Sequence, residues 1–412
     1  MSLLYHLGIH LYSALLFVLA SFGHQKAKHW VNGRKNWRNR LQEKFKHIPS
    51  CVWFHCASLG EYELSVPLIE SLKLQYPEKK ILVTFFSPSG YEVKKNDALV
   101  FHIDYLPIDS AKNARVFIDT VKPETVLFAK YDYWYHYLRL LNAKKIPTYV
   151  FSATFRESQV FFKSYGSWYK HMLFQFTQLF VTNEASKKLL QQAGITNVEV
   201  TGDNRYDKVF STATQNKVFP LIEKFKANSQ LLIAGSSWPE DELILASLIH
   251  ANIPSLKYVI APHEISSNHL QHLEQKLTVK SIRYSQLDEQ TKLDDICVII
   301  LDNIGMLSSL YKYGNISYVG GAFKQGLHNI LEPISFGLPV IFGPQYKKYP
   351  EASDFIACGG AFSITDEASL KLIVKKLLHV EEQEQIKKIN AAEIAKHMGA
   401  TEKIMHFISW KI

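Results

Sequence analysis

Short apolar runs alternate with helix-like stretches along most of this chain, and that alternation limits the possible folds more than any other feature. Runs such as Cys51–Phe54 and Ile316–Val319 lead into turns rich in glycine, serine or charged residues, and a helical pattern follows. Strands that alternate with helices in this way form parallel sheets covered on both faces. We therefore predict an α/β fold built from doubly wound, Rossmann-like domains.

The length of the chain predicts two domains, because 412 residues exceed one ordinary hydrophobic core. A content of 47% hydrophobic and 21% charged residues is typical of a folded protein. The predicted parts are a membrane anchor helix (1–23), a basic juxtamembrane segment (24–47), an N-terminal domain (48–210), a polar hinge (211–228), a C-terminal domain (229–380) and terminal helices (381–412). We expect these last helices to form a solvated packing layer that crosses back onto the first domain.

The net charge of +9 is concentrated in one segment. Residues 24–46 hold eight Lys or Arg against Glu43, a net +7, which leaves about +2 for the rest of the chain. This local basicity argues against a body that binds nucleic acid and favours a basic collar beside a membrane.

Residues 3–22 contain no Asp, Glu, Lys or Arg and are long enough to cross a bilayer. A cleavable signal peptide is less favoured, since no Lys or Arg precedes the segment and no A-x-A site follows it. His6 and His10 leave an interfacial helix open. The basic collar is expected on the cytoplasmic side, with Trp30 and Trp37 in the headgroup layer.

The four cysteines form no CxxC pair and have no zinc-like spacing. We expect a reducing compartment, no disulfide and a buried structural role for Cys56.

Charged side chains follow several strands of the first predicted domain. In a parallel sheet these positions lie at one edge, where ligands bind. The residues predicted to converge there are Glu61, Lys130, Asp132, Arg156 and Arg205. Glu61 fits a general base on a glycine-hinged loop, or simply an acid at a helix start.

The stretch 318–344 predicts a phosphate and ribose site in the second domain. Gly320 and Gly321 follow a strand and let the backbone approach a phosphate closely. Asn329 and Glu332 lie one helical turn apart and can face one ligand. Spacing alone leaves an ordinary βαβ crossover equally open.

Several enzyme classes lose support because their motifs are absent from the sequence. The chain does not open on G-x-G-x-x-G, and it has no Walker A loop, H-E-x-x-H or nucleophile elbow. A dinucleotide oxidoreductase, a P-loop NTPase and a zincin are therefore disfavoured.

Four motifs occur in order: A-S-L-G-E (57–61), G-S-S-W-P-E-D-E (235–242), A-P-H-E (261–264) and H-N-I-L-E-P followed by F-G-L-P-V-I-F-G-P (328–344). Together they resemble the 3-deoxy-D-manno-octulosonic acid (Kdo) transferase family of lipopolysaccharide synthesis. The similarity runs from about residue 52 to 361, and the membrane helix with its basic collar is also like that family.

The resemblance implies a GT-B glycosyltransferase fold, with two Rossmann-like domains facing across a cleft. It implies transfer of Kdo from CMP-Kdo to a lipid A precursor, with inversion, at the cytoplasmic face of the bacterial inner membrane. No cofactor or metal is expected, because a monophosphate leaving group has no diphosphate to bridge. The alternatives are another GT-B enzyme that uses a UDP-sugar, whether a transferase or a 2-epimerase, and a non-catalytic membrane-associated scaffold.

The same resemblance suggests catalytic roles for three residues. Glu61 matches the base that deprotonates the acceptor. Asp132 lies where the family has the Glu of an E-L-W motif, and Arg205 lies where it has a Lys. Lys130 stands where the family has a Glu, and the segment containing Thr154 and Arg156 is altered, so the roles at these positions stay open.

For the nucleotide, the resemblance suggests three short segments. Pro262 and His263 match a family Pro-Arg pair, with His in place of Arg. A Gly-Glu-Leu or Gly-Glu-Met turn is matched without its Glu, and the H-N-x-L-E-P block is matched without change. The residues concerned are Gly305, Met306, Leu307, Asn329, Ile330, Leu331 and Glu332.

Overall fold

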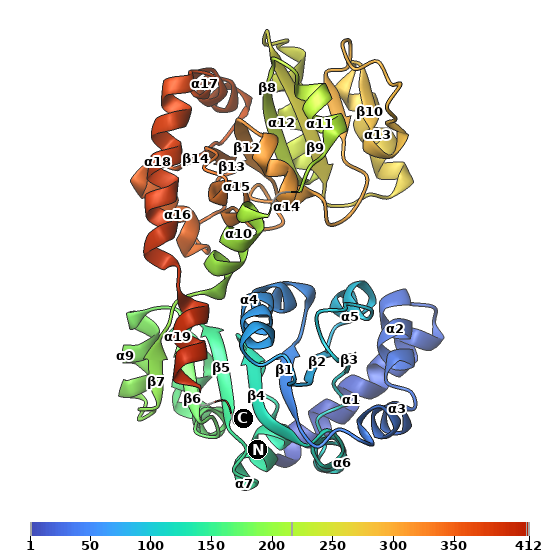
Figure 1. The fold of residues 1–412 in the computed structure, drawn as a ribbon, viewed down its shortest axis with the longest axis vertical. Helices are drawn as coiled ribbons and strands as arrows, with labels where there is room; N and C mark the ends of the chain where they lie inside the picture. Colours follow the sequence, from blue (N-terminus) through green and yellow to red (C-terminus); the bar gives the residue numbers. More distant parts are fainter. Residues whose placement is uncertain (1, 216, 409, 411–412) are drawn as a thin grey trace. The chain divides into compact units, whose positions relative to one another are not determined.

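The computed structural model describes residues 2–215, 217–408 and 410. The chain forms two compact units, one of residues 1–208 with 398–412, and one of residues 209–397 (Figure 1). Each unit contains one sheet, and each sheet is fully parallel, as the alternation of strands and helices predicts.

The first unit is built on a seven-stranded sheet of order β3-β2-β1-β4-β5-β6-β7. The strands are β1 (Cys51–Cys56), β2 (Ile81–Phe85), β3 (His102–Tyr105), β4 (Pro123–Ala129), β5 (Thr148–Ala153), β6 (Gln178–Val181) and β7 (Val198–Val200). Every residue of β1 and β2 is buried, which is expected of strands covered on both faces.

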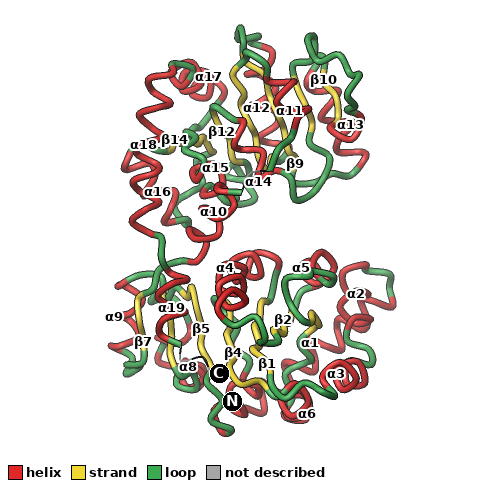
Figure 2. The backbone as a smooth tube through the Cα atoms, viewed as in Figure 1, coloured by secondary structure: helices red, strands yellow, loops and turns green. Residues whose placement is uncertain are grey.

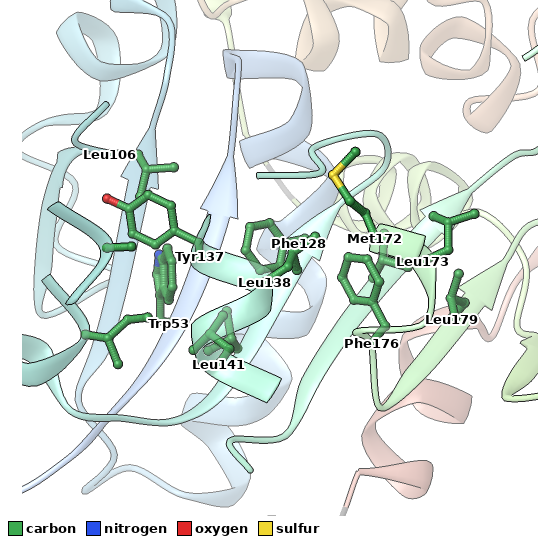
Figure 3. Close-up of a cluster of buried hydrophobic side chains, with 14 of the residues drawn as sticks. Trp53, Leu106, Phe128, Tyr137, Leu138, Leu141, Met172, Leu173, Phe176 and Leu179 are labelled. Atoms are coloured by element: carbon green, nitrogen blue, oxygen red, sulfur yellow. The ribbon is translucent and has the colours of Figure 1, made fainter. Parts of the chain in front are cut away.

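Helices cover both faces of this sheet, as the tube in Figure 2 shows. One face packs against α3 (Trp37–Phe45), α6 (Ala111–Val121), α7 (Tyr135–Ala143), α8 (Ser167–Leu173) and α9 (Glu184–Gln192). Figure 3 shows part of that core, where Trp53 and Phe128 of the sheet meet Tyr137 and Leu141 of α7. The other face packs against α4 (Leu59–Gln75) and α19 (Ala400–Phe407). The unit also contains α5 (Pro88–Lys94), the start of α10 (Asn204–Thr214) and two short 3-10 turns, Val160–Phe162 and Ser164–Gly166.

The N-terminal segment forms α1 (Ser2–Ser21), α2 (Gln25–Gly33) and α3. By length and composition α1 could cross a membrane, and only 6% of its window Leu4–Ser21 is buried. Yet α1 also contacts the first unit: the Tyr5 hydroxyl donates to Asp109 Oδ2 (2.6 Å), and the Tyr12 ring stacks on Phe86 (6.1 Å between centroids).

The predicted place of Trp30 and Trp37 in a lipid headgroup layer is wrong. Both indoles are buried inside the first unit, with 4% and 9% of their surface exposed. Trp37 contacts Phe117 of α6, so α3 belongs to the hydrophobic core of this unit. The helical spacing of the segment directs these large apolar rings to the body of the protein.

Two arginines of the basic collar also have structural positions. Arg34 is buried among the rings of Trp30, Phe86 and Tyr105, and it donates to three backbone carbonyl oxygens. Arg40 makes a two-pronged contact with the fully buried Asp104, at 2.7 and 3.0 Å. The solvated collar is therefore smaller than the sequence suggests, although most of its lysines are exposed.

The second unit is built on a seven-stranded sheet of order β10-β11-β9-β8-β12-β13-β14. The strands are β8 (Gln230–Ser237), β9 (Leu256–Pro262), β10 (Ser281–Arg283), β11 (Val298–Ile300), β12 (Ile316–Val319), β13 (Val340–Phe342) and β14 (Ala361–Ser363). Sequence reasoning missed β10, a short edge strand whose residues are only half buried.

This second sheet is also covered on both faces. One face packs against α12 (Pro239–His250), α13 (Ser267–Leu277), α17 (Glu367–Leu377) and α18 (Val380–His397). The other packs against α11 (Pro220–Lys226), α14 (Leu307–Leu310) and the 3-10 turn Tyr311–Tyr313. The remaining elements are α15 (Leu331–Ser335), α16 (Pro350–Cys358) and the 3-10 turn Tyr284–Gln286.

The predicted hinge, 211–228, is not an irregular linker. Helix α10 runs through the division between the units, and the side chains of Ile222 and Phe225 in α11 are buried in the second core. The terminal helices also divide: α18 lies in the second unit, whereas α19 returns to the first, where Ile404 and Met405 join the core. The predicted crossing back is thus confirmed, and residues 381–412 do not form one separate part.

Candidate functional site

The first sheet has a topological switch point between β1 and β4, because successive strands lie on opposite sides of that pair. Loops that leave two such strands diverge, and ligands bind between them at the carboxyl ends. The loop after β1 leads to Glu61, and the loop after β4 carries Lys130 and Asp132. The structure therefore brings together three of the five residues that were predicted to converge.

Glu61 lies in the first turn of α4, three residues after Ser58. The Ser58 N–H donates to Glu61 Oε2 (3.1 Å), so the carboxylate caps the start of the helix. Burial, and next the negative charge of Asp132, raise the pKa of Glu61 from 4.5 to about 7, although the N–H groups of Ser58 and Ala57 and the charge of Lys130 oppose the change. A carboxyl group with a pKa near neutrality is suited to general base catalysis.

Asp132 is held next to a buried histidine. His55 Nε2 lies 3.2 Å from Asp132 Oδ2 and also accepts the indole N–H of Trp134, at 2.9 Å. His55 Nδ1 lies 2.8 Å from the Thr84 hydroxyl oxygen. The site at the switch point therefore contains two carboxyl groups, those of Glu61 and Asp132, and the buried His55 imidazole lies next to Asp132.

The other predicted residues of this edge have different surroundings. Arg205 lies at the start of α10 and forms an ion pair with Asp203 (2.8 Å). Arg156 is exposed. The Thr154 hydroxyl lies 2.8 Å from that of Thr182. The catalytic roles suggested for Asp132 and Arg205 stay predictions.

Sequence reasoning did not include His55 in the site. The signal was present, because His55 is the one polar side chain in the otherwise apolar run C-V-W-F-H-C, directly before the A-S-L-G-E loop. A fully buried polar group requires hydrogen-bonding partners, and such partners at the carboxyl end of a strand often belong to a site. Cys56 beside it is a buried thiol, as expected, and it contacts the Ser65 hydroxyl (3.1 Å).

The second sheet has its own switch point, between β8 and β12. Asp241 holds the two loops there together: Oδ1 accepts the Tyr318 hydroxyl (2.6 Å), and Oδ2 accepts the N–H of Trp238 and of Gly321 (both 2.9 Å). The approach is close, since a Cβ on Gly320 would lie 2.4 Å from the backbone oxygen of Ser236, near the end of β8. The two glycines therefore allow this contact within the protein, and the predicted phosphate site at these glycines stays a prediction.

Three flat rings gather at the same edge. His263 stacks on Trp238 with centroids 4.4 Å apart, and His263 lies 4.7 Å from His328. The Trp238 indole N–H donates to His328 Nε2 (3.0 Å), so the ring proton of a neutral His328 sits on Nδ1. Burial, followed by the charge of His263, lowers the pKa of His328 to about 4, and His328 is therefore uncharged near neutrality. Trp238 and His328 were not predicted as site residues.

The predicted nucleotide residues lie in three loops of this unit. His263 and Asn329 are exposed. The Asn329 side-chain amide donates to Glu332 Oε1 (3.1 Å), so the side chains of Asn329 and Glu332 lie together. Gly305 is exposed in a left-handed conformation (φ 91°), ahead of Met306 and Leu307 at the start of α14.

Three of the predicted nucleotide contacts have buried side chains. Pro262 ends β9, and Ile330 and Leu331 are 1% and 0% exposed. Their side chains belong to the core, so a ligand could meet only their backbone. Whether any of these residues binds a nucleotide stays a prediction. Within the described ranges, no three His, Cys, Asp or Glu side chains gather closely enough to hold a metal ion.

Comparison with known proteins shows similarity to one family. Residues 35–208, which include the whole Glu61 site, match the family model of 3-deoxy-D-manno-octulosonic acid transferase. The 3-deoxy-D-manno-octulosonic acid transferase of Haemophilus influenzae is 28% identical over 395 residues, covering 90% of this chain and 91% of that protein. The chain is similar to the Kdo transferase family over most of its length. The Kdo transferase of Chlamydophila psittaci is 26% identical over 373 residues, covering 86% of this chain and 85% of that protein.

Solved structures with a similar fold agree with the predicted architecture. The UDP-GlcNAc 2-epimerase from Neisseria meningitidis, bound to UDP-GlcNAc, superposes with a TM-score of 0.60 at 17% identity, covering 87% of this chain and 98% of the epimerase. At that identity the likeness shows the fold alone. The predicted GT-B class, with two doubly wound parallel sheets, is confirmed.

Proposed function

We propose that this protein transfers Kdo from CMP-Kdo to a lipid A precursor, lipid IVA, with inversion at the anomeric carbon. The observation that carries the proposal is Glu61: a carboxyl group with its pKa raised to about 7, at the switch point of a sheet whose sequence matches the Kdo transferase family. Glu61 takes the proton of an acceptor hydroxyl. The acceptor oxygen then bonds to the anomeric carbon, and the bond from that carbon to the phosphate oxygen breaks, releasing CMP.

The second unit is proposed to bind the donor. Asn329 and Glu332 present an amide and a carboxylate that suit the ribose hydroxyls, and the exposed His263 ring replaces the Arg that the family has at this position. The exposed turn at Gly305 has a left-handed conformation (φ 91°) that suits the binding of an anion by backbone N–H groups.

We propose that departure of CMP needs no metal ion. A single phosphate leaves, and Arg205, at the first turn of α10, together with the helix N-terminus can stabilise its charge. Transfer should then proceed at an unchanged rate in excess EDTA. A rate that falls with EDTA and returns with Mg²⁺ would contradict this part of the proposal.

The acceptor is acylated, and α1 is proposed to bring the enzyme to the cytoplasmic face of the bacterial inner membrane. One side of α1 contacts the first unit at Tyr5 and Tyr12, while Leu7, Leu11 and Leu15 are each more than half exposed. A helix with one apolar side docked and the other exposed fits an orientation in the membrane interface. The exposed lysines of α2 and α3 suit the phosphates of anionic lipid and of the acceptor.

Purified protein, CMP-Kdo and a lipid A precursor, with mass spectrometry of the product, test the function. We expect one or more Kdo additions with wild type and none with Glu61→Gln, which keeps the shape of the side chain but cannot accept the proton. Glu63→Gln is the matched control, because Glu63 lies on the same helix and pairs with Lys94 (2.8 Å) at the surface. Full activity of Glu61→Gln would exclude Glu61 as the base.

A second candidate is an enzyme that uses a UDP-sugar, favoured by the fold that this chain shares with UDP-GlcNAc 2-epimerase. Thermal-shift titration separates the two donors. We expect CMP to raise the Tm and UDP to have little effect, whereas the opposite result would reject CMP-Kdo. A non-catalytic scaffold would show no transfer with either donor.

A further inference from the structure

His55 lies inside β1, fully buried, at the bottom of the site that contains Glu61. A buried imidazole requires partners for both ring nitrogens, and here each of them has one. The partners also fix where the ring proton lies, because an indole N–H can only donate a hydrogen bond.

Hydrogen bonds from two indole N–H groups, those of Trp134 and Trp53, indicate which nitrogen of a neutral His55 carries the ring proton. Trp134 donates its N–H to His55 Nε2 (2.9 Å), so Nε2 presents an electron pair and the proton of the neutral ring sits on Nδ1. Nδ1–H can then donate to the Thr84 hydroxyl oxygen (2.8 Å). Trp53 donates to that same oxygen (2.8 Å), which fixes Thr84 in turn.

Asp132 approaches the same nitrogen from another direction. Its Oδ2 lies 3.2 Å from His55 Nε2, is buried, and has no hydrogen-bond partner in the described part of the chain. Two atoms that both carry electron pairs repel each other at this distance. A proton placed between them changes the contact into a charge-assisted attraction.

The charge of the His55–Asp132 pair acts on Glu61. The negative charge of Asp132 is the second cause, after burial, of the raised pKa of Glu61. Among the described residues, the other titratable groups that interact with Glu61 or Asp132 include Lys130 and Tyr133, which follow β4, and the Cys56 thiol at the end of β1. A proton on the His55–Asp132 pair removes most of the negative charge that Glu61 experiences.

We propose that His55 is a positioning residue that shares a proton with the Asp132 carboxyl and so sets the charge facing Glu61. The Trp134 N–H donates to Nε2, and Asp132 Oδ2 places an acceptor beside the same nitrogen. The inference deepens the proposed function and rests on Glu61 as the base. In this proposal, the shared proton is what allows Glu61, a partly buried base, to ionise near neutral pH.

The direct test follows the titration of Glu61 by NMR of carbon-13 carboxyl-labelled glutamate, with Glu61→Gln to assign the signal. In His55→Asn, the side-chain amide of Asn lies near the position of Nδ1, and no atom replaces Nε2. We expect His55→Asn to raise the pKa of Glu61 by about one unit and Asp132→Asn to lower it by about one unit. In the Asp132→Asn background, His55→Asn should cause no further shift. An equal shift in both backgrounds, or none in either, would overturn the proposal.

The pH dependence of the Kdo transfer rate distinguishes this role of His55 from a purely structural one. In His55→Asn the rate of Kdo transfer at pH 7 should fall several-fold and recover above pH 8, whereas a packing defect lowers the rate at every pH. If His55→Asn does not fold, His55→Gln places a non-titrating amide near Asp132 and should likewise uncouple the pair. Trp53→Phe is the control, because it removes one contact to Thr84 but leaves Nε2 and Asp132 in place.

The titration needs no substrate, so the two proposals fail separately. Coupled titration without Kdo transfer by wild type would reject the proposed function and keep the His55–Asp132 pair. Kdo transfer without coupling would reject the pair alone.

Discussion

Replacing Glu61 with Gln should stabilise the protein at alkaline pH and leave its stability unchanged at acid pH. Partial burial of the carboxyl group, together with the negative charge of Asp132, raises its pKa from 4.5 to about 7. The folded state therefore resists the ionisation that the unfolded chain undergoes freely. The amide of Gln can still accept the Ser58 N–H, so the helix start is preserved.

The sign and size follow from linkage. Below about pH 4.5 the group is protonated in both states and contributes no difference. Stability is lost as pH rises from 4.5 to about 7, and the loss is complete above that range. Each pKa unit corresponds to ~1.4 kcal/mol, so the upper limit is about 3 kcal/mol, and partial exposure reduces the expected gain for Glu61→Gln to about 1–2 kcal/mol.

Thermal unfolding of wild type and Glu61→Gln at pH 5 and pH 8 measures the effect. For a unit of this size the gain corresponds to a Tm higher by about 3–6 °C at pH 8, with little change at pH 5. Glu63→Gln is the control and should not be stabilised, because it loses surface ion pairs with Lys94 and Lys208. A Glu61→Gln variant that is no more stable at pH 8 than wild type would refute a buried, hard-to-ionise base.

Three further variants test other parts of the structure. Arg34→Met should lower the free energy of unfolding of the first unit by about 3 kcal/mol in urea denaturation, since three backbone carbonyls lose their buried donor; a loss below 1 kcal/mol would contradict that role. Gly321→Ala places a Cβ 2.2 Å from a loop carbonyl oxygen at φ 95°, so CMP should no longer raise the Tm; a normal shift would show that this loop does not bind the nucleotide. Leu7→Glu combined with Leu11→Glu should weaken co-sedimentation with anionic vesicles about tenfold, whereas Leu74→Glu, at an exposed leucine on α4, should not; equal binding by all would exclude α1 as the membrane contact.

The fold could be predicted from the sequence because a parallel sheet buried on both faces makes strands short, apolar and sharply bounded. The strand Ile316–Val319 was predicted with the bounds that the structure shows. The strand β10 was missed because its three residues, Ser281–Arg283, are half exposed and include only one apolar side chain. The basic segment was misread for a related reason: charge density suggests a lipid surface, but only three-dimensional packing shows that Trp30 and Arg34 face inward.

The candidate site could be predicted where its residues belong to a recognisable sequence motif. Glu61 follows directly after a strand in a recognisable loop, and Asn329 and Glu332 lie one turn apart. Contacts between distant segments were not predictable, because no local pattern records them. The approach of His55 to Asp132 and Trp134, about eighty residues later, depends on β1 and β4 being neighbours in the sheet.

The two units place a carboxylate at the same structural position and use it differently. Glu61 and Asp241 each lie in the first turn of the helix that follows the strand at a switch point, and each accepts a backbone N–H from three residues earlier. Burial raises the pKa of both. Asp241, however, also accepts Tyr318 and Gly321, which occupy its oxygens and tie two loops together. Glu61 accepts from the backbone of Ser58 and Ala57 and experiences the negative charge of a second carboxyl group, Asp132. The same helix start therefore supports a structural clamp in one unit and, in the proposed function, a general base in the other, and the difference lies in what surrounds the carboxylate.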